Sequence, residues 1–350
     1  MPSPARWPTH VIVVAFVLLL AACGAQDPVD GSPGSSAEGS PGGSAPSAED
    51  PVSFVISHAT TGINSVPSAA AADALREMGY DVETVVVDAS ELSVEGVATG
   101  RFAFGASGNS TALLGMAAGG DLKFIVDELA NEWSLYARQE IEECADLDGQ
   151  PVGIFSEGGV STAMVRNYFA TSCPDAEPSY LILGDSPTRA AALVAGEIAA
   201  TPVELSDALN LEATAPDVVH ELASFAEALP DLKTTSFYGN SAFMAEHPQA
   251  TRDFIRALLE QFRRIDGDPE YLREITLEYY PSVSEDTLDA AVEAYVERGL
   301  FPVNGGLTEE NLEYTIDFFV EAEVVEPGIT VDQAADLSYL EAVLDEIGEE

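Results

Sequence analysis

The sequence predicts an α/β protein with two similar lobes, and three observations support this. Between residues 53 and 127, short apolar strand-like segments alternate with helical segments about every 20 residues, which indicates βαβ units and a mostly parallel sheet. The same alternation starts again at residue 151. Hydrophobic residues make up 46% of the chain, and about 300 residues follow a Gly/Ser/Pro-rich stretch, a length typical of two compact units.

In the first region, glycines mark the ends of helices and a β-branched run marks a strand. An Ala-rich helix stops at Gly79, the run VETVVV that follows favours a strand, and the next helix ends at Gly119 and Gly120. The expected strands are 53–57, 81–87, 102–106 and 122–127, and the expected helices are 68–78 and 110–118.

The second region repeats this pattern and then gives way to helices. Its expected strands are 151–155, 180–183 and 197–203, and its expected helices are 160–171 and 187–195. A strand-like segment at 236–244 precedes helices expected at 247–265, 269–280, 285–297, 308–322 and 331–347. Apolar residues at helical spacing predict a buried face on these helices, with Phe254, Leu258, Phe262, Tyr279, Tyr280, Phe318 and Phe319 in the core.

The chain begins with a segment typical of a lipoprotein signal peptide. Arg6 precedes twelve apolar residues, Val11 to Ala22, which are too few to span a bilayer as a helix but suit the apolar region of a signal peptide. The run ends in Leu-Ala-Ala-Cys, which predicts removal of residues 1–22 and lipid attachment to Cys23. A secretory signal with an incidental cysteine is the alternative.

Residues 23–50 are dominated by Gly, Ser and Pro and predict a flexible linker. A flexible chain of this length has a root-mean-square reach of about 30 Å. The folded part is therefore expected outside the cytoplasm, held near the membrane by the lipid on Cys23.

The net charge is -46, from 60 acidic and 14 basic residues. Such a surface repels nucleic acid and anionic lipid headgroups, so neither is an expected partner. An acidic, solvated coat suited to high salt explains the charge without a specific function. Codon bias is another explanation for the presence of only two lysines, Lys123 and Lys233.

Two cysteines remain once Cys23 is assigned to lipid. Cys144 precedes a predicted strand, and Cys173 ends the helix that returns from the far end of that strand, so both are expected at one edge of a lobe. In an oxidising compartment they are a candidate disulfide. Two buried free thiols are the alternative.

Several segments, taken in order, resemble the solute-binding proteins of ABC importers of the nitrate/sulfonate/taurine and thiamine-precursor type. They are AAADALREMGYDVE at 70–83, VATGRFAFG at 97–105, DLDGQPVG at 146–153, ALVAGEIAA at 192–200, AFMAEHP at 242–248, FIRALL at 254–259 and DLSYL at 336–340. The similarity covers nearly the whole chain after the linker.

The resemblance implies a two-lobed, periplasmic-binding-protein-like (type II) clamp with a helical C-terminal region. Lobe 1 is expected to comprise residues 51–132 plus 240–350, and lobe 2 residues 133–239. Crossovers near residues 131–136 and 235–240 are expected to act as hinges. The implied ligand is a sulfonate, another oxyanion or a pyrimidine-like heterocycle.

In open α/β sheets, ligands bind beyond the carboxyl ends of the strands, and four loops follow such ends here. Two Gly-containing loops, 106–110 and 156–162, each open a helix whose free N–H groups can hold an anion or a carbonyl. Ordinary N-capping by Ser and Asn is the alternative. The candidate ligand-binding residues are His58, Thr60, Thr61, Ser107, Gly108, Asn109, Ser110, Glu157, Gly158, Gly159, Val160, Ser161, Thr201, Glu204 and Tyr238.

The charge of the ligand depends on two glutamates. If Glu157 and Glu204 point inward, they disfavour a dianion and favour a neutral or cationic heterocycle; if they point outward, oxyanions remain candidates. Arg138 is the nearest candidate cation or an ordinary surface residue, and His58 is a ligand contact or a plain loop histidine. Trp133, Tyr136, Phe237 and Tyr238 either stack on a flat ligand or pack in the core.

The Leu-Ala-Ala-Cys segment, the linker and the two-lobed pattern together predict a non-catalytic, monomeric substrate-binding protein that delivers its ligand to an ABC permease. No metal and no cofactor are expected. Two other functions stay open: a pyrimidine-precursor enzyme on the same fold, and a ligand-sensing partner of a membrane kinase or receptor. The four histidines, at positions 10, 58, 220 and 247, are scattered, and no Ser/His/Asp order suggests a catalytic triad.

Overall fold

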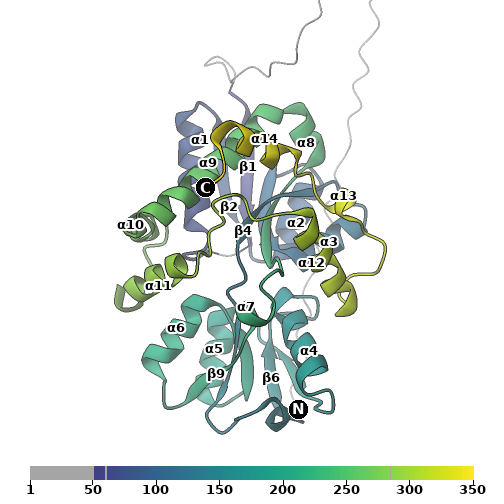
Figure 1. The fold of residues 1–350 in the computed structure, drawn as a ribbon, viewed down its shortest axis with the longest axis vertical. Helices are drawn as coiled ribbons and strands as arrows, with labels where there is room; N and C mark the ends of the chain where they lie inside the picture. The colour runs from purple at the N-terminus through teal and green to yellow at the C-terminus, as the bar shows by residue number, and fades with distance from the viewer. Residues whose placement is uncertain (1–50, 60, 284) are drawn as a thin grey trace, which may run out of the picture. The chain divides into compact units, whose positions relative to one another are not determined.

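The computed structural model describes residues 51–59, 61–283 and 285–350. The strands in these ranges form two five-stranded sheets with flanking helices, in the orders β2-β1-β3-β10-β4 and β7-β6-β8-β5-β9 (Figure 1). The predicted two-lobed α/β fold is thus confirmed. The predicted signal peptide, Cys23, the linker and Thr60 lie outside the described residues.

The first sheet combines parallel and antiparallel strands. Its strands are β1 (Ser53–His58), β2 (Asp81–Val86), β3 (Phe104–Gly108), β4 (Lys123–Leu129) and β10 (Thr235–Gly239). β1 pairs in parallel with β2 and β3, whereas β10 runs antiparallel to both β3 and β4.

The second sheet repeats this arrangement. Its strands are β5 (Ser134–Arg138), β6 (Pro151–Ile154), β7 (Ser179–Ile182), β8 (Ala200–Val203) and β9 (Val219–Ser224). β6 is parallel to β7 and β8, and β5 is antiparallel to β8 and β9. The prediction of mostly parallel sheets is therefore wrong for half of the strand pairs. The chain reaches β5 and β10 by passing over from the other lobe. Neither strand therefore follows a neighbour of its own sheet through the helical crossover that a parallel pair requires.

The chain returns from the second sheet to the first before residue 240, the position at which the sequence places the return to lobe 1. Thr235–Gly239, expected at the end of lobe 2, forms β10 of the first sheet. The strand expected at 236–244 also ends early, because Asn240 caps helix α8 (Ser241–Glu246) by accepting a hydrogen bond from the Phe243 amide at 2.9 Å.

The first sheet is covered by α1 (Val66–Glu77), α2 (Ser90–Ala98), α3 (Asn109–Ala117) and α9 (Pro248–Gly267) (Figure 1). Helix α2 has no counterpart among the elements predicted from the sequence. Phe254 of α9 stacks on Phe104 of β3 with ring centroids 4.6 Å apart, and both rings are buried. The predicted apolar face of the long helix therefore packs on the sheet.

The helices of the second lobe are α4 (Val160–Ser172), α5 (Ser186–Ala195), α6 (Leu205–Thr214) and α7 (Phe225–Ala228). The C-terminal helices are α10 (Pro269–Tyr279), α11 (Glu285–Glu297), α12 (Glu309–Glu321), α13 (Val331–Ala334) and α14 (Ser338–Ile347). The helix expected at 331–347 is interrupted because the Asp336 amide donates to the Phe124 carbonyl oxygen at 3.0 Å. Within the described ranges, no helix has the length and hydropathy needed to cross a membrane.

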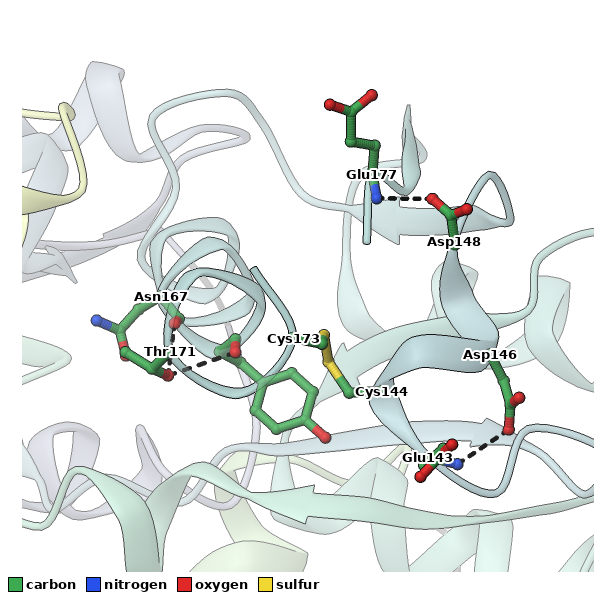
Figure 2. Close-up of a disulfide and its surroundings, with 9 residues drawn as sticks. Glu143, Cys144, Asp146, Asp148, Asn167, Thr171, Cys173 and Glu177 are labelled. Carbon is green, nitrogen blue, oxygen red and sulfur yellow. Dashed lines mark hydrogen bonds between the residues drawn. A yellow bond between two sulfur atoms is a disulfide. The ribbon is translucent and has the colours of Figure 1, made fainter. Parts of the chain in front are cut away.

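A disulfide joins Cys144 and Cys173, whose Cα atoms lie 6.0 Å apart (Figure 2). Cys144 begins a short 3-10 helix, Cys144–Leu147, and Cys173 follows the last residue of α4. Nearby, the amide of Glu177 donates to Asp148 at 2.9 Å, which ties the segment after Cys173 to the segment after Cys144 (Figure 2). The pairing that the sequence left open is present in the structure.

Candidate functional site

A cavity, called the interlobe cavity below, is lined by residues of both sheets and of the segment that joins β4 to β5. Its volume is about 100 Å³, whereas a single water needs roughly 10–15 Å³ on the same measure. It therefore has room for a small molecule. Its lining residues are His58, Ala59, Asn64, Ser90, Ala106, Ser107, Gly108, Thr111, Glu128, Leu129, Glu132, Trp133, Phe155, Gly159, Val160, Ser161, Glu204, Thr234 and Thr235.

Three helices are preceded by residues that line this cavity, and a fourth, α2, begins at the lining residue Ser90. The residues that precede α3, α4 and α6 are Gly108, Gly159 and Glu204, and none of these three caps its helix with a side-chain hydrogen bond. All three belong to the cavity lining. Together with α2, the positive ends of four helix dipoles therefore lie at the cavity wall, two in each lobe.

Three carboxyl groups line the cavity: Glu128, Glu132 and Glu204. Burial, and after it the neighbouring charges of Asp127 and Glu204, raise the pKa of Glu128 to about 8. Burial also raises the pKa of Glu132 and of Glu204, and each is then raised by a neighbouring acid. The cavity therefore holds carboxyl groups that are difficult to ionise together.

Glu128 is the least compensated of the three. Its side chain is only 7% exposed, and its Oε1 lies 3.7 Å from Nδ1 of His58. It has no hydrogen-bond partner among the residues that the structure describes. Glu132, by contrast, accepts a hydrogen bond from the Tyr295 hydroxyl at 2.6 Å.

His58 does not supply a positive charge to Glu128. Its Nε2 forms a 2.9 Å hydrogen bond with the Ser68 hydroxyl, and its ring meets that of Phe237 edge to face at 5.6 Å. Burial lowers the pKa of His58 to about 4, so the imidazole is neutral at physiological pH.

No lysine or arginine is among the described residues that line the cavity. Three basic side chains that are not part of the lining pair with other groups. Lys233 Nζ lies 3.1 Å from the buried Asp127 Oδ2. Arg189 is fully buried and donates to Thr201 Oγ1 at 3.1 Å and to the Pro202 carbonyl oxygen at 2.9 Å. Arg138, the cation proposed from the sequence, instead pairs with Glu140.

Seven of the candidate residues predicted from the sequence line the interlobe cavity. They are His58, Ser107, Gly108, Gly159, Val160, Ser161 and Glu204. Seven others lie outside its lining: Thr61, Asn109, Ser110, Glu157, Gly158, Thr201 and Tyr238. Of the four aromatic candidates, only Trp133 lines it.

The residues outside the lining have other partners that explain their positions. Tyr238 is buried, and its hydroxyl lies 2.8 Å from both the Ser93 and the Ser107 hydroxyls. Thr201 donates to the Gly153 carbonyl oxygen at 3.0 Å inside the second sheet. Glu157 points outward and pairs with Arg166. Of the two glutamates that bear on ligand charge, Glu204 therefore faces the cavity and Glu157 does not.

Two of these residues support the cavity from outside. Ser110 donates from its hydroxyl to the Gly158 carbonyl oxygen at 2.8 Å, which connects the first turn of α3 with the loop before α4. Asn109 donates from Nδ2 to the Lys233 carbonyl oxygen and to the Ser236 hydroxyl, each at 3.0 Å. They join the loops that carry the lining residues.

Glu128 and Glu132 are not among the residues predicted from the sequence. A signal was available in the segment FIVDELANE at 124–132, where acidic residues follow a strongly apolar strand. Charged residues that continue a buried strand are unusual and indicate a functional cluster. The apolar lining residues Leu129 and Phe155 also went unidentified, because they do not differ from ordinary core residues in the sequence.

Solved structures with the same fold come from several organisms. The ligand-binding component of an ABC-type import system from Staphylococcus aureus shares 13% identity at a TM-score of 0.70, over 83% of this chain and 99% of that chain. The alkanesulfonate-binding protein SsuA from Xanthomonas axonopodis pv. citri, bound to MOPS, shares 17% at 0.65, over 83% and 99%. The periplasmic nitrate-binding protein NrtA from Synechocystis PCC 6803 shares 10% at 0.66, over 85% and 90%.

The TM-scores show a common fold. No curated protein matches the chain. The model of the NMT1/THI5-like family matches residues 69–270, more than half of the chain and most of both sheets. The protein therefore belongs to the NMT1/THI5-like family.

Proposed function

We propose that the protein is an extracytoplasmic, lipid-anchored substrate-binding protein that captures a small molecule and delivers it to the permease of an ABC importer. One observation carries the proposal: a cavity at the strand ends of a two-lobed fold, lined by residues of both lobes. Sites of this position and construction bind small ligands in α/β folds. The names of its structural neighbours, an ABC-type import component and binding proteins for sulfonate and nitrate, support the transport role.

The two lobes suit a clamp that closes on its ligand. Two short segments pass between the sheets, residues 130–133 from β4 to β5 and residues 229–234 from α7 to β10. A ligand that contacts both lobes favours the closed arrangement by its extra contacts there. The Ser110–Gly158 hydrogen bond adds to the same arrangement, since its two residues flank helices of different lobes.

The first 50 residues support the location. The Leu-Ala-Ala-Cys ending of the apolar run and the Gly/Ser/Pro-rich stretch after it are what a lipid-anchored protein requires. With Cys23 lipidated, the linker keeps the binding domain within about 30 Å of the membrane. Repeated delivery to a permease in the same membrane becomes efficient because the local concentration is high.

Native mass spectrometry of the protein purified from its own cells tests this proposal. We expect a small molecule that co-purifies, is released intact by unfolding and rebinds to the emptied protein. Conversion of that molecule into another on incubation with the protein would favour the enzyme alternative. Intact binding without uptake in cells that contain the importer would favour the sensing alternative, so uptake of the identified molecule by cells with and without the gene completes the test.

A further inference from the structure

The interlobe cavity has an acidic lining, and no lysine or arginine is among the described residues that line it. Glu128, Glu132 and Glu204 come from β4, from the segment after it and from the residue before α6. Glu128 is the clearest sign of a missing partner, because its side chain is only 7% exposed and the one basic group paired with it, the imidazole of His58 at 3.7 Å, is neutral. A buried carboxylate is costly unless a positive group or hydrogen-bond donors accompany it.

The charged groups around these three carboxyls do not change this balance. Asp127 on β4, Asp207 on α6 and Asp185 at the start of α5 add negative charge. Lys233 is paired with Asp127. Arg189 is not part of the lining; its charge lowers the pKa of Glu204, its donors serve Thr201 and main-chain oxygens, and its guanidinium carbon lies 6.0 Å from the centroid of the Trp133 ring. On the side of the first sheet, Tyr238 and His58 are both neutral at physiological pH because burial moves their pKa values away from neutrality.

The remaining walls are apolar and partly aromatic. Leu129, Trp133, Phe155 and Val160 line the same cavity as the three carboxyls. An aromatic face attracts a cation through its quadrupole, and it packs well on a flat ligand. The lining therefore offers acceptors at one part and a surface for a planar apolar body at another.

We infer that the ligand is a small organic cation, with an ammonium, amidinium or guanidinium group on a flat apolar body, whose charge is held by Glu128, Glu132 and Glu204. This inference rests on the proposed binding function and specifies the ligand class. It disfavours the sulfonate and other oxyanions expected from the resemblance, since an oxyanion would meet three carboxyls and no lysine or arginine of the described lining. The helix N-termini at the cavity remain available to a polar group at the other end of the ligand.

A metal ion is a weaker explanation for the same acids. In the described part of the chain, no three His, Cys, Asp or Glu side chains are grouped closely enough to hold a metal ion. An organic cation does not need its acceptors to converge at a single point. It can distribute several N–H donors over separate carboxylates.

Three probes of nearly identical shape test the charge directly: benzamidinium, benzamide and benzoate. All three are planar, and they carry a positive, a zero and a negative charge. Isothermal titration calorimetry with the ligand-free protein should show benzamidinium binding roughly tenfold or more tightly than benzamide, with no measurable binding of benzoate. Nitrate and ethanesulfonate serve as the oxyanion probes.

Variants connect the binding to the proposed residues. Glu128→Gln removes a charge with little change in shape, and we expect it to weaken benzamidinium roughly tenfold while leaving benzamide unchanged. Glu204→Gln provides a second, less buried site for the same test. Glu310→Gln, an exposed change of the same chemistry on α12, is the matched control and should leave every affinity as in the wild type.

The outcomes separate this inference from the proposed function. Preference for benzamidinium that is lost in Glu128→Gln and kept in Glu310→Gln supports the inference. Binding of benzoate, nitrate or ethanesulfonate in preference to benzamidinium overturns it and leaves the binding function intact. Absence of binding for benzamidinium and for a wider set of organic cations also overturns the inference. The proposed function is tested separately, by identifying the molecule that co-purifies with the protein.

Discussion

Oε1 of Glu128 lies 3.7 Å from Nδ1 of His58, yet the two residues do not form an ion pair at neutral pH. Burial raises the pKa of Glu128 to about 8 and lowers that of His58 to about 4. In the interval between these values, both groups are neutral. The empty cavity is therefore less charged than its composition suggests, and a cationic ligand would change the protonation of the wall that binds it.

The first prediction concerns stability and pH. Because folding raises the pKa of Glu128 from 4.5 to about 8, this group stabilises the folded state at low pH, and the contribution is lost as pH rises through that interval. His58, with a lowered pKa, acts in the opposite sense as pH falls below 6.5. We expect Glu128→Gln to melt higher than the wild type at pH 8 and nearly equal to it at pH 5.

The largest difference that a pKa shift of this size supports is about 4 kcal/mol, and partial relaxation of the buried site reduces it. Scanning calorimetry of the ligand-free protein across this pH range measures the effect. A lower melting temperature for Glu128→Gln than for the wild type at pH 8 would contradict the prediction, because it would mean that neighbouring groups stabilise the Glu128 carboxylate. Glu310→Gln is the control for the loss of one charge.

The second prediction concerns the affinity for a cation as pH changes. Deprotonated Glu128 is the form that attracts benzamidinium, so binding releases a proton wherever the empty site is protonated. Affinity should rise by up to about tenfold per pH unit between pH 6 and 8 for each proton released. Calorimetry in buffers of different ionisation enthalpy counts the protons, and a pH-independent affinity contradicts the prediction.

The third prediction concerns Tyr295, which lies on α11 outside the second sheet. Its hydroxyl donates to Glu132 at 2.6 Å and lowers the pKa of that carboxyl against the effect of burial. Tyr295→Phe should raise the pKa of Glu132 and weaken cation binding more at pH 7 than at pH 9. In the cation complex Glu132 is ionised, so the hydrogen bond then involves a charged group, and its loss should weaken binding by about 1.5–3 kcal/mol at neutral pH.

Carbon-13 NMR titration of the glutamate carboxyl groups measures the pKa in Tyr295→Phe directly. Recovery of affinity at high pH separates this electrostatic effect from a structural one. A loss of equal size at both pH values would indicate that Tyr295 acts through packing, since its ring is buried and stacks near Phe301.

The fourth prediction concerns the hydrogen bond between the lobes. Ser110→Ala removes the 2.8 Å bond from the Ser110 hydroxyl to the Gly158 carbonyl oxygen. A net contribution of about 0.5–1.5 kcal/mol to the ligand-bound arrangement predicts a Kd that rises up to roughly tenfold. Ser172→Ala, an exposed change at the end of α4, is the matched control.

Small-angle scattering of Ser110→Ala with saturating ligand should show the same compaction as the wild type, reached at higher ligand concentration. Unchanged affinity in Ser110→Ala would mean that the Ser110–Gly158 hydrogen bond stabilises the ligand-free and the ligand-bound protein equally. The distinction matters because only contacts that differ between two arrangements shift the balance between them.

The fifth prediction concerns the disulfide. The bond between Cys144 and Cys173 closes a loop with a sequence separation of 29 residues, for which the chain-entropy model gives about 3–4 kcal/mol. The double variant Cys144→Ala/Cys173→Ala should lose stability by this order in a urea titration of the domain without its signal and linker. Reducing agent should destabilise the wild type and have no effect on the double variant.

The local alternation of apolar runs predicted most strands and the long amphipathic helices, because burial on one face leaves a periodic trace in the sequence. Helices α2 and α6 and strands β5 and β9 were missed. Val94 and Val97 are the buried apolar residues of α2, and its remaining buried positions are Ser90, Ser93 and Gly96, so its pattern is weak. β5 and β9 pair with each other through residues more than 80 positions apart, which local patterns do not record.

The candidate site was predicted in position more accurately than in chemistry. Loops at strand ends are visible from the order of elements, and His58, Ser107, Gly159 and Glu204 do line the interlobe cavity. Tyr238 was the favoured aromatic contact, but it lies in the core between two serine hydroxyls. Hydrogen-bond partners of this kind come from distant segments and leave no local signature.

The sequence by itself determined the α/β class, the two lobes, the family resemblance and the two cysteines available for a disulfide, because each depends on residue type, order or spacing. Only the tertiary structure decided that β10 runs antiparallel inside the first sheet and that Glu128, Glu132 and Glu204 meet at one cavity. The physical reason is that strand pairing and pKa values depend on which distant groups become neighbours and on how much water they lose. Those quantities exist only in the folded chain.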